Sequence, residues 1–483
     1  MDYETVIGLE CHVELSTETK MFCGCSAKFG APPNTNVCSV CLGHPGTLPV
    51  PNEKAIEYIV RIGLALDCAI APHSLFHRKN YFYPDMPKDF QISQYDLPIC
   101  IDGHLDVEVG GESRRIGITR VHMEEDTGKT THAGDTGRIH DADYALVDFN
   151  RAGVPLVECV SEPDIRSPEE AAAYLRELRG TLLSLDVSDV RMEEGSLRCD
   201  GNISLRPASS TEFGVKVEIK NMNSIRSLER ALRYEQERQG AALDAGEKLM
   251  QETRHWNENE GRTTSMRSKE EAFDYRYFPE PDLPMLEPRR EWIERIRASL
   301  PELPAARRER YVSGSGLTIE QANAIAGDKH LSKLFEGTSA QFDAVPAKVV
   351  ANWVVQNLAA VMNDRGITSE QLTLEPQRFA EVILMVDDGT ISITAGKQVL
   401  DEMVATGKTA AEIVQEKGLR QISDISALEA WVDETIAENP GPVEQFRSGK
   451  EGVVGFLVGQ VMRKSGGSAN PKAVGDMFRE RLT

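Results

Sequence analysis

The sequence lacks the long apolar segments that would place it in a membrane. No uncharged apolar run among its 483 residues approaches the roughly 20 residues that span a bilayer. The first residues, Met1-Asp2-Tyr3-Glu4-Thr5, also lack the basic segment that begins a secretory signal peptide. We therefore expect a soluble, cytoplasmic protein with no membrane association.

Positive charge is scarce as well. The chain has 54 Lys and Arg against 76 Asp and Glu, a formal net charge of −22. A protein that wraps wholly around nucleic acid needs an excess of phosphate-binding Lys and Arg, so any nucleic-acid contact of this chain must be local.

One candidate for a local contact is the segment 445–483, where basic residues outnumber acidic ones by about four. An ordinary solvated helical face has the same composition. The basic residues are Arg447, Lys450, Arg463, Lys464, Lys472, Arg479 and Arg481.

The sequence also lacks a glycine-rich phosphate loop. No GxxxxGK[ST] pattern occurs, and neither Gly201 nor Gly214 belongs to a glycine cluster. Backbone N–H groups of such loops commonly bind nucleotide phosphates. A nucleotide bound by this chain must therefore be held in another way.

Cysteine is too sparse for a disulfide framework but includes one close group. Nine cysteines form an odd set, which argues against a secreted, disulfide-stapled domain. Cys23-Gly24-Cys25 and Cys38-Ser39-Val40-Cys41 are two thiolate pairs separated by 12 residues. Four thiolates close a tetrahedral coordination sphere, so the pattern predicts a structural zinc knot over 23–41. Four unrelated reduced cysteines are the alternative, and His44 could replace one ligand.

The length predicts several domains. Up to about residue 285, alternating runs and turn residues, such as 104–109 followed by Gly110-Gly111, predict a mainly antiparallel sheet. Ser167, Pro168 and Glu170 form the pattern of a helix N-terminus with a capping box. The proline-rich segment 278–284 interrupts helix and strand alike.

Beyond this break the pattern becomes helical. Apolar residues three and four apart predict helices at 347–361, 376–386, 395–404, 410–417 and 426–437, and a further break falls at 439–442. The expected fold class is α+β, with the sheet domain first and the helices after it.

The first strand carries candidate metal ligands. Its alternation places Glu10, His12 and Glu14 on one face and apolar residues, including Cys11, on the other. Two carboxylates and an imidazole suit a divalent cation. A strand with one wet face would alternate in the same way.

Further carboxylates lie near the ends of other predicted strands. These are Glu124, Glu125, Asp200, Glu218 and Glu252. A single acidic doublet is usually only solvated, but several carboxylates with His12 could hold Mg²⁺ against substrate phosphates. The segment 78–85 adds Arg78, Lys79 and three aromatic residues, a mixture suited to phosphate contact and base stacking, although it is also typical of a core.

Six segments together closely resemble one family, the B subunits of the glutamyl-tRNA(Gln)/aspartyl-tRNA(Asn) amidotransferase, the GatB/GatE family. The resemblance spans nearly the whole chain. The segments are Ile7–Leu15, Arg78–Asp85, His122–Asp126, Asp148–Glu158, Met192–Asp200 and Asp274–Asp282.

The resemblance implies a cradle domain over 1–290, a helical domain over 291–405 and a tail domain over 406–483 that contacts tRNA. It also implies an ATP- and Mg²⁺-dependent ligase. In this family the A subunit is an amidase that frees ammonia from glutamine, and a small C subunit wraps the pair. The B subunit phosphorylates the side-chain carboxylate of a misacylated tRNA, and ammonia then displaces the phosphate.

The resemblance also implies roles for the candidate residues. We expect Glu10, His12, Glu125 and Glu252 to bind the metal ions. We expect Lys79 and Tyr81 to contact the nucleotide. Glu124 and Glu218 would belong to the acidic lining, Asp200 and Asn150 would support it, and Glu14 would line the approach. Cys11, which replaces an aliphatic residue common in the family, lies on the core side and should not affect the metal face.

Two other functions remain open from the sequence. The chain could be a tRNA-binding scaffold whose acidic residues only line a channel, or a zinc-containing nuclease that uses Mg²⁺. The sequence also leaves open whether Glu-tRNA(Gln), Asp-tRNA(Asn) or both are substrates.

Overall fold

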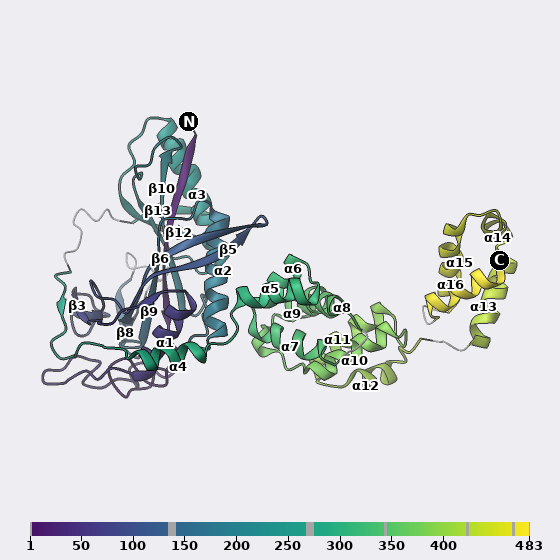
Figure 1. Cartoon of the computed structure of the whole chain (residues 1–483), viewed down its shortest axis with the longest axis horizontal. Helices are drawn as coiled ribbons and strands as arrows, with labels where there is room; N and C mark the ends of the chain where they lie inside the picture. Colours follow the sequence, from purple (N-terminus) through teal and green to yellow (C-terminus); the bar gives the residue numbers. More distant parts are fainter. Residues whose placement is uncertain are drawn as a thin grey trace. The chain divides into compact units, whose positions relative to one another are not determined.

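The computed structural model describes residues 2–133, 142–266, 275–341, 345–421, 425–465 and 469–482. Contacts divide the chain into two compact units, Met1–Ala306 and Arg307–Thr483. The first unit holds the described strands, and the second is helical (Figure 1). The expected α+β class, with an antiparallel sheet followed by helices, is confirmed.

The first unit is built on a nine-stranded sheet with the order β13-β12-β11-β10-β1-β9-β6-β5-β2. Its described neighbours pair antiparallel, apart from the parallel pair β11 and β12. The strands are β1 (Tyr3–Glu14), β2 (Ala69–Ile70), β5 (Cys100–Val109), β6 (Glu112–Glu125), β9 (Pro155–Ser161), β10 (Leu197–Pro207), β11 (Val217–Lys220), β12 (Glu252–Asn257) and β13 (Arg262–Ser265).

One face of this sheet is covered by helices. Ile7, Leu9, Cys11 and Val13 of β1 are fully buried in a hydrophobic cluster with residues of three helices. These are α1 (Glu53–Ala65), α2 (Pro168–Ser184) and α3 (Ile225–Asp244), and α4 (Arg290–Ala298) adds Ile296 to the same cluster. The opposite face of β1, which carries Glu10 and His12, is left for polar groups.

Helix α2 begins as the sequence predicts, with one difference. The Ser167 side chain accepts a hydrogen bond from the Glu170 N–H, and Pro168 occupies the first turn. The Glu170 carboxylate, however, accepts from the Arg166 N–H at 2.8 Å. The N-cap is therefore confirmed. The second hydrogen bond of the capping box, from the Glu170 side chain, is made to the N–H of the residue before the N-cap.

A three-stranded sheet lies beside the end of β6. It consists of β14 (Phe278–Pro279), β3 (His77–Asn80) and β4 (Phe90–Ser93), in that order. Side-chain hydrogen bonds, and no backbone ladder, join β4 and the residue after it to β6. Ser93 Oγ donates to Glu124 at 2.9 Å, and the Met123 N–H donates to the Gln94 side chain at 3.1 Å. A two-stranded sheet, β7 (Lys129–Ala133) with β8 (Tyr144–Asp148), completes the described strands.

The second unit contains two separate hydrophobic clusters, one around Trp353 and Phe379 and another around Val432 and Phe478. Its helices are α5 (Pro304–Ser315), α6 (Ile319–Ala326), α7 (Lys329–Ser339), α8 (Ala347–Asn352), α9 (Ala359–Arg365), α10 (Pro376–Asp387), α11 (Ile393–Thr406), α12 (Ala410–Lys417), α13 (Ile425–Glu438), α14 (Pro440–Arg447), α15 (Val454–Lys464) and α16 (Pro471–Leu482).

Four of the predicted helices, α10 to α13, are confirmed within two residues at each end. The helix expected over 347–361 continues to Arg365. The division into cradle, helical and tail domains stays a prediction.

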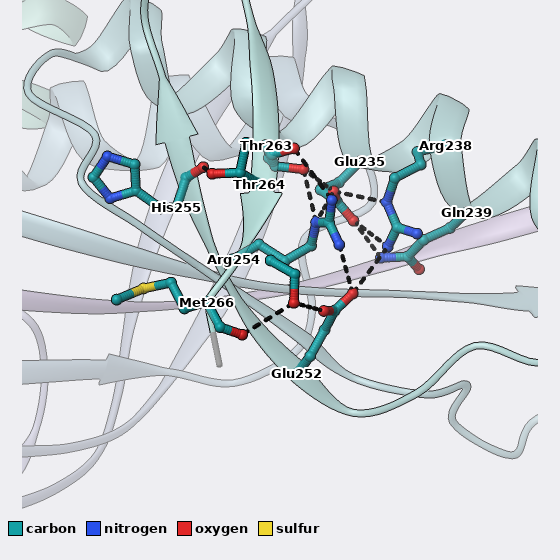
Figure 2. Close-up of polar contacts among 10 residues, drawn as sticks. Glu235, Arg238, Gln239, Glu252, Arg254, His255, Thr263, Thr264 and Met266 are labelled. Carbon is teal, nitrogen blue, oxygen red and sulfur yellow. Dashed lines mark hydrogen bonds and ion pairs between the residues drawn. The ribbon is translucent and has the colours of Figure 1, made fainter. Parts of the chain in front are cut away.

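A buried ionic network fixes β12 against α3 (Figure 2). The Glu235 side chain is 0% exposed and lies between two arginines. Arg238 donates to both of its oxygens at 2.9 and 2.8 Å, and Arg254 Nε lies 3.0 Å from Oε1. Arg254 also donates to Glu252 at 2.6 Å. Since a buried charge is tolerated only when it is paired, these contacts hold the strand and the helix in register.

We predict that Glu235→Ala lowers the free energy of unfolding by about 3 kcal/mol, because it leaves buried arginine charge without its partner. The exposed pair Glu229–Arg233 offers a control, and Glu229→Gln should cost less than about 0.5 kcal/mol. Urea denaturation followed by tryptophan fluorescence measures both, since Trp256 is buried beside α3. Equal unfolding midpoints for the two variants would contradict this account.

Candidate functional site

The polar face of β1 meets charged residues from both neighbouring strands. His12 lies opposite Glu158 of β9 and Arg198 of β10. His122 of β6 lies opposite Glu158 on the far side of β9. Because side chains on adjacent antiparallel strands share a face when their residues are directly opposed, the register alone gathers these groups.

His12, Glu124 and Glu158 form a cluster that could hold a metal ion. One ligand atom from each lies within 4.8 Å of the others. Both carboxylates are buried, and His12 Nε2 lies 3.8 Å from Glu158 Oε2. Two carboxylates and an imidazole are a donor set for a divalent cation.

Nearby cations keep these buried carboxylates charged. Burial alone would raise the pKa of Glu124, but the Lys79 ammonium and His122 outweigh it and hold that pKa well below its ordinary value. His122 Nε2 lies 3.1 Å from Glu158 and lowers the pKa of that carboxyl in the same way against its burial. The cluster is therefore anionic at neutral pH.

Lys79 connects the cluster to a group of aromatic rings. Its Nζ lies 3.7 Å from Glu124 Oε1 and 5.2 Å from the centre of the Tyr275 ring. Tyr81 and Tyr277 each meet Tyr275 edge to face, and Tyr277 stacks on Tyr95 at 4.3 Å. The structure thus brings the predicted nucleotide contacts Lys79 and Tyr81 to the same place as Glu124.

An acidic row continues from Glu10 across the sheet. Glu10 lies opposite Asp200 of β10, and Asn202 Nδ2 donates to its Oε1 at 2.9 Å. Lys220 bridges Asp200 at 2.6 Å and Glu218 at 2.9 Å. Glu10, Asp200 and Glu218 therefore share the face of His12, with Glu10 one pleat away, about 7 Å along the strand.

Glu125 is not brought to this cluster. It follows Glu124 directly, and successive residues of a strand point to opposite faces. Its carboxylate pairs with Lys88 and accepts a hydrogen bond from the Ile92 N–H at 2.9 Å. It lines a different cavity of about 250 Å³, which it shares with Cys23 and Cys41.

Glu252 is also held elsewhere. The parallel register pairs it with Val217, a buried residue on the helix-covered face, whereas Glu218 is opposite Thr253. Figure 2 shows Glu252 within the arginine network of β12 and α3. The described structure therefore does not bring the predicted ligands Glu10, His12, Glu125 and Glu252 together, and the carboxylates that lie beside His12 are Glu124 and Glu158.

Glu158 and His122 belong to the site but are not among the site residues predicted from the sequence. Glu158 is the one charged residue in the buried strand Pro155–Ser161. A single carboxylate within an apolar strand is the sequence feature that could have indicated a functional residue. Charged residues are rare in strands buried on both faces unless they have a partner or a function.

Glu14 lies at the end of the polar row. Burial, followed by the neighbouring Asp126, raises its pKa to about 8. Burial would raise the pKa of Asp126, but Arg198, which donates to it at 2.7 Å, and Arg151 lower that pKa below its ordinary value. Glu14 also lines a surface cavity with Asp189 and Glu194.

The four cysteines of the predicted knot come together. The sulfur atoms of Cys23, Cys25, Cys38 and Cys41 all lie within 4.8 Å of one another, which is compatible with a structural zinc ion. His44 lines the adjoining cavity but is not one of the four. Asn150 accepts from the Asn36 N–H at 2.7 Å and donates to the Pro32 carbonyl at 2.7 Å, so it fixes the loop between the cysteine pairs.

Two protein-family models match this chain. A model of the GatB/GatE catalytic domain matches residues 5–294, and a model of the GatB domain matches residues 333–482. The chain belongs to the GatB/GatE family. The catalytic-domain match includes the His12 cluster, Lys79 and the cysteine knot.

Full-length relatives agree with this assignment. The chain is 53% identical over 482 residues to the B subunit of the aspartyl/glutamyl-tRNA(Asn/Gln) amidotransferase of Moorella thermoacetica, covering 100% of both chains. It is 51% identical to the protein of the same name from Carboxydothermus hydrogenoformans, covering 100% of this chain and 99% of that one. For Thermodesulfovibrio yellowstonii the identity is 52%, with 99% of each chain covered. Among the described residues, no helix is both long enough and apolar enough to cross a bilayer.

We predict that the purified chain carries one zinc ion on the cysteine knot. Cys25→Ser should reduce the zinc content to below about a tenth, since three thiolates bind zinc far more weakly than four. Cys68→Ser is the control, because Cys68 is buried away from the four and contacts the Leu66 carbonyl. Elemental analysis after dialysis measures both, and an undiminished zinc content in Cys25→Ser would contradict the assignment.

Proposed function

We propose that this chain is the B subunit of a glutamine-dependent tRNA amidotransferase. It would phosphorylate the side-chain carboxylate of Glu-tRNA(Gln), Asp-tRNA(Asn) or both with ATP, and then amidate it to give Gln-tRNA(Gln) or Asn-tRNA(Asn). The observation that carries the proposal is the buried His12–Glu124–Glu158 cluster with Lys79 beside it. The names of the full-length relatives support the same reaction class, a carbon–nitrogen ligase.

The chemistry requires activation because a carboxylate has no good leaving group. The substrate carboxylate oxygen attacks the γ-phosphorus of ATP, the bond from that phosphorus to the bridging oxygen breaks, and ADP leaves. Ammonia then attacks the acyl carbon, the bond from carbon to the phosphate oxygen breaks, and phosphate leaves as the nitrogen loses a proton. Such phosphoryl transfer depends on positioning and on neutralising negative charge.

The residues of the site fit these demands. His12, Glu124 and Glu158 would hold Mg²⁺, which supplies positive charge to phosphate oxygens when bound. Lys79 would add a second positive charge, since its Nζ lies 3.7 Å from Glu124 Oε1 and is held by that carboxylate and the Tyr275 ring. Lys220, between Asp200 and Glu218, keeps the acidic row from repelling a bound polyphosphate.

The proposal includes partners and compartment. An amidase A subunit would supply ammonia, and a small C subunit would complete the heterotrimer. Misacylated tRNA would bind through the C-terminal tail. A role in aminoacyl-tRNA synthesis would be carried out in the cytoplasm.

The test is Glu124→Gln in the assembled enzyme. We expect tRNA-dependent ATP cleavage to fall at least about 100-fold, because the substitution removes one charge from the metal-binding cluster, while glutaminase activity remains. Glu112→Gln, at the exposed start of the same strand, is the matched control and should cleave ATP normally. If ATP cleavage survives in Glu124→Gln, the tRNA-binding scaffold becomes the better account.

The tail offers a separate prediction about tRNA. Lys464 and Arg481 pair with acidic residues of α13. In the described part of the chain, no acidic side chain pairs with four other exposed cations, which are Arg447, Lys450, Arg463 and Lys472. These four are the better candidates for phosphate contacts.

Replacing the four cations by Gln should weaken tRNA binding and reduce the slope of log affinity against log salt by up to about four, roughly one per lost phosphate contact. The double variant Lys464→Gln/Arg481→Gln is the control, since its charges already have partners. Filter-binding titrations over a range of salt concentrations measure the slopes. An unchanged slope in the quadruple variant would contradict a tail contact.

A further inference from the structure

A fully buried lysine lies beside the cysteine knot. Lys20 is 1% exposed and stands shortly before Cys23, the first cysteine of the knot. Lysine is rarely buried to this extent unless its charge has a partner, because removing an ammonium group from water is costly. The surroundings of Lys20 should therefore supply a negative charge.

Two hydrogen bonds hold the Lys20 ammonium. Its Nζ donates to Cys41 Sγ at 3.6 Å and to the Phe149 carbonyl at 3.1 Å. In the described part of the chain, no carboxylate forms an ion pair with it. A carbonyl oxygen carries no net charge, so of these two acceptors only the sulfur of Cys41 can become an anion.

The backbone of Lys20 is tied to the other cysteine pair. Its N–H donates to the Cys25 carbonyl at 2.9 Å, whereas its side chain reaches Cys41 in the second pair. The four sulfur atoms lie within 4.8 Å of one another. Because one residue contacts both halves of the knot, its ammonium is held close to the whole group of sulfur atoms.

Gly153 encloses the contact between Lys20 and Cys41. Its φ of +87° lies in the region that favours glycine, and a Cβ there would lie 3.5 Å from Cys41 Cβ and 3.5 Å from Lys20 Cδ. Its carbonyl accepts from the Met21 N–H at 2.7 Å, which holds this turn against the lysine. Water is therefore largely kept from the contact, and attraction between opposite charges is stronger where water is excluded.

Charge balance connects Lys20 with a metal ion in the knot. Cysteines that bind zinc are ionised, so Zn²⁺ with four thiolates carries two net negative charges. One ammonium offsets half of that charge. If the four thiols were instead neutral and free of metal, the buried charge of Lys20 would have no counter-charge, an arrangement that is costly.

We propose that Lys20 is the counter-charge of the metal-loaded knot, and that its ammonium strengthens the binding of zinc by the four cysteines. The proposal concerns the knot alone and holds whatever reaction the chain catalyses. The second hydrogen bond of Lys20, to the Phe149 carbonyl, connects the same group to the turn at 149–153.

The experiment measures the zinc affinity of the full-length chain by competition with a chromophoric chelator. Lys20→Met removes the charge and keeps the length of the side chain. We expect zinc binding to weaken about tenfold or more, as is usual when a group that contacts a metal ligand is lost. Lys28→Met is the matched control, because Lys28 is exposed in the loop between the cysteine pairs. Water screens its charge, so zinc affinity should change less than about twofold.

A second variant separates the charge from the hydrogen bond. Lys20→Gln keeps a side-chain donor for the Phe149 carbonyl but is neutral. It should lose as much zinc affinity as Lys20→Met, and it provides the same test if Lys20→Met does not fold. Wild-type zinc affinity in Lys20→Gln would show that the charge is not needed, which would overturn the proposal.

Thermal unfolding with and without zinc distinguishes a counter-charge from a residue that only fills space. In the zinc-loaded chain, Lys20→Met should lower the unfolding temperature, because the thiolates lose their counter-charge. In the reduced chain stripped by a chelator, it should leave that temperature unchanged or raise it, because the wild-type ammonium is then buried beside neutral thiols. Equal losses in both forms would show a packing role only and contradict the proposal.

The outcomes also separate this proposal from the zinc assignment. Equal zinc affinities in the wild type and in both Lys20 variants would overturn the role of Lys20 and leave the knot as a zinc site. A wild-type chain that binds no zinc would refute the knot as a metal site, and the role of Lys20 with it.

Discussion

The alternation of side chains along one central strand is the constraint on which the rest of the site depends. β1 lies in the middle of the nine-stranded sheet, and its apolar residues are fully buried against helices. A shift of its register by one residue would turn Glu10 and His12 into that core. The burial of Ile7, Leu9, Cys11 and Val13 therefore fixes the polar face as firmly as it fixes the fold.

Charge compensation is the second requirement. Glu124 and Glu158 lie in a region from which water is largely excluded, and they keep their charge because Lys79 and His122 face them. Ser93 and Gln91 add hydrogen bonds to Glu124 at 2.9 and 3.2 Å. Each member has a partner, so the cluster is fixed in position before any ligand arrives.

The sequence predicts the local features of this protein better than its long-range pairings. The face of β1, the Ser167 cap, the gathering of the four cysteines and most helices of the second unit follow from patterns within a few residues. Glu125 and Glu252, which lie away from the His12 cluster, could not be assigned from local patterns. Glu125 is next to Glu124 in the sequence, but adjacent strand residues point to opposite faces, and Glu125 lines another cavity. The side of Glu252 depends on a parallel pairing of β12 with β11, which no local pattern shows. Glu158 completes the cluster only because β9 lies between β1 and β6, and strand order is a property of the whole chain.

The side-chain contacts between β4 and β6 have a mechanical consequence. Lys79 belongs to the three-stranded sheet, whereas His12 and Glu158 belong to the large one. The two sheets are joined at the end of β6 by individual hydrogen bonds from Gln91, Ile92 and Ser93 to Glu124 and Glu125, each worth about 1 kcal/mol, and not by a continuous backbone ladder. The position of Lys79 relative to His12 and Glu158 therefore depends on the side chains at the end of β6, and not on the backbone ladders that set the register within either sheet.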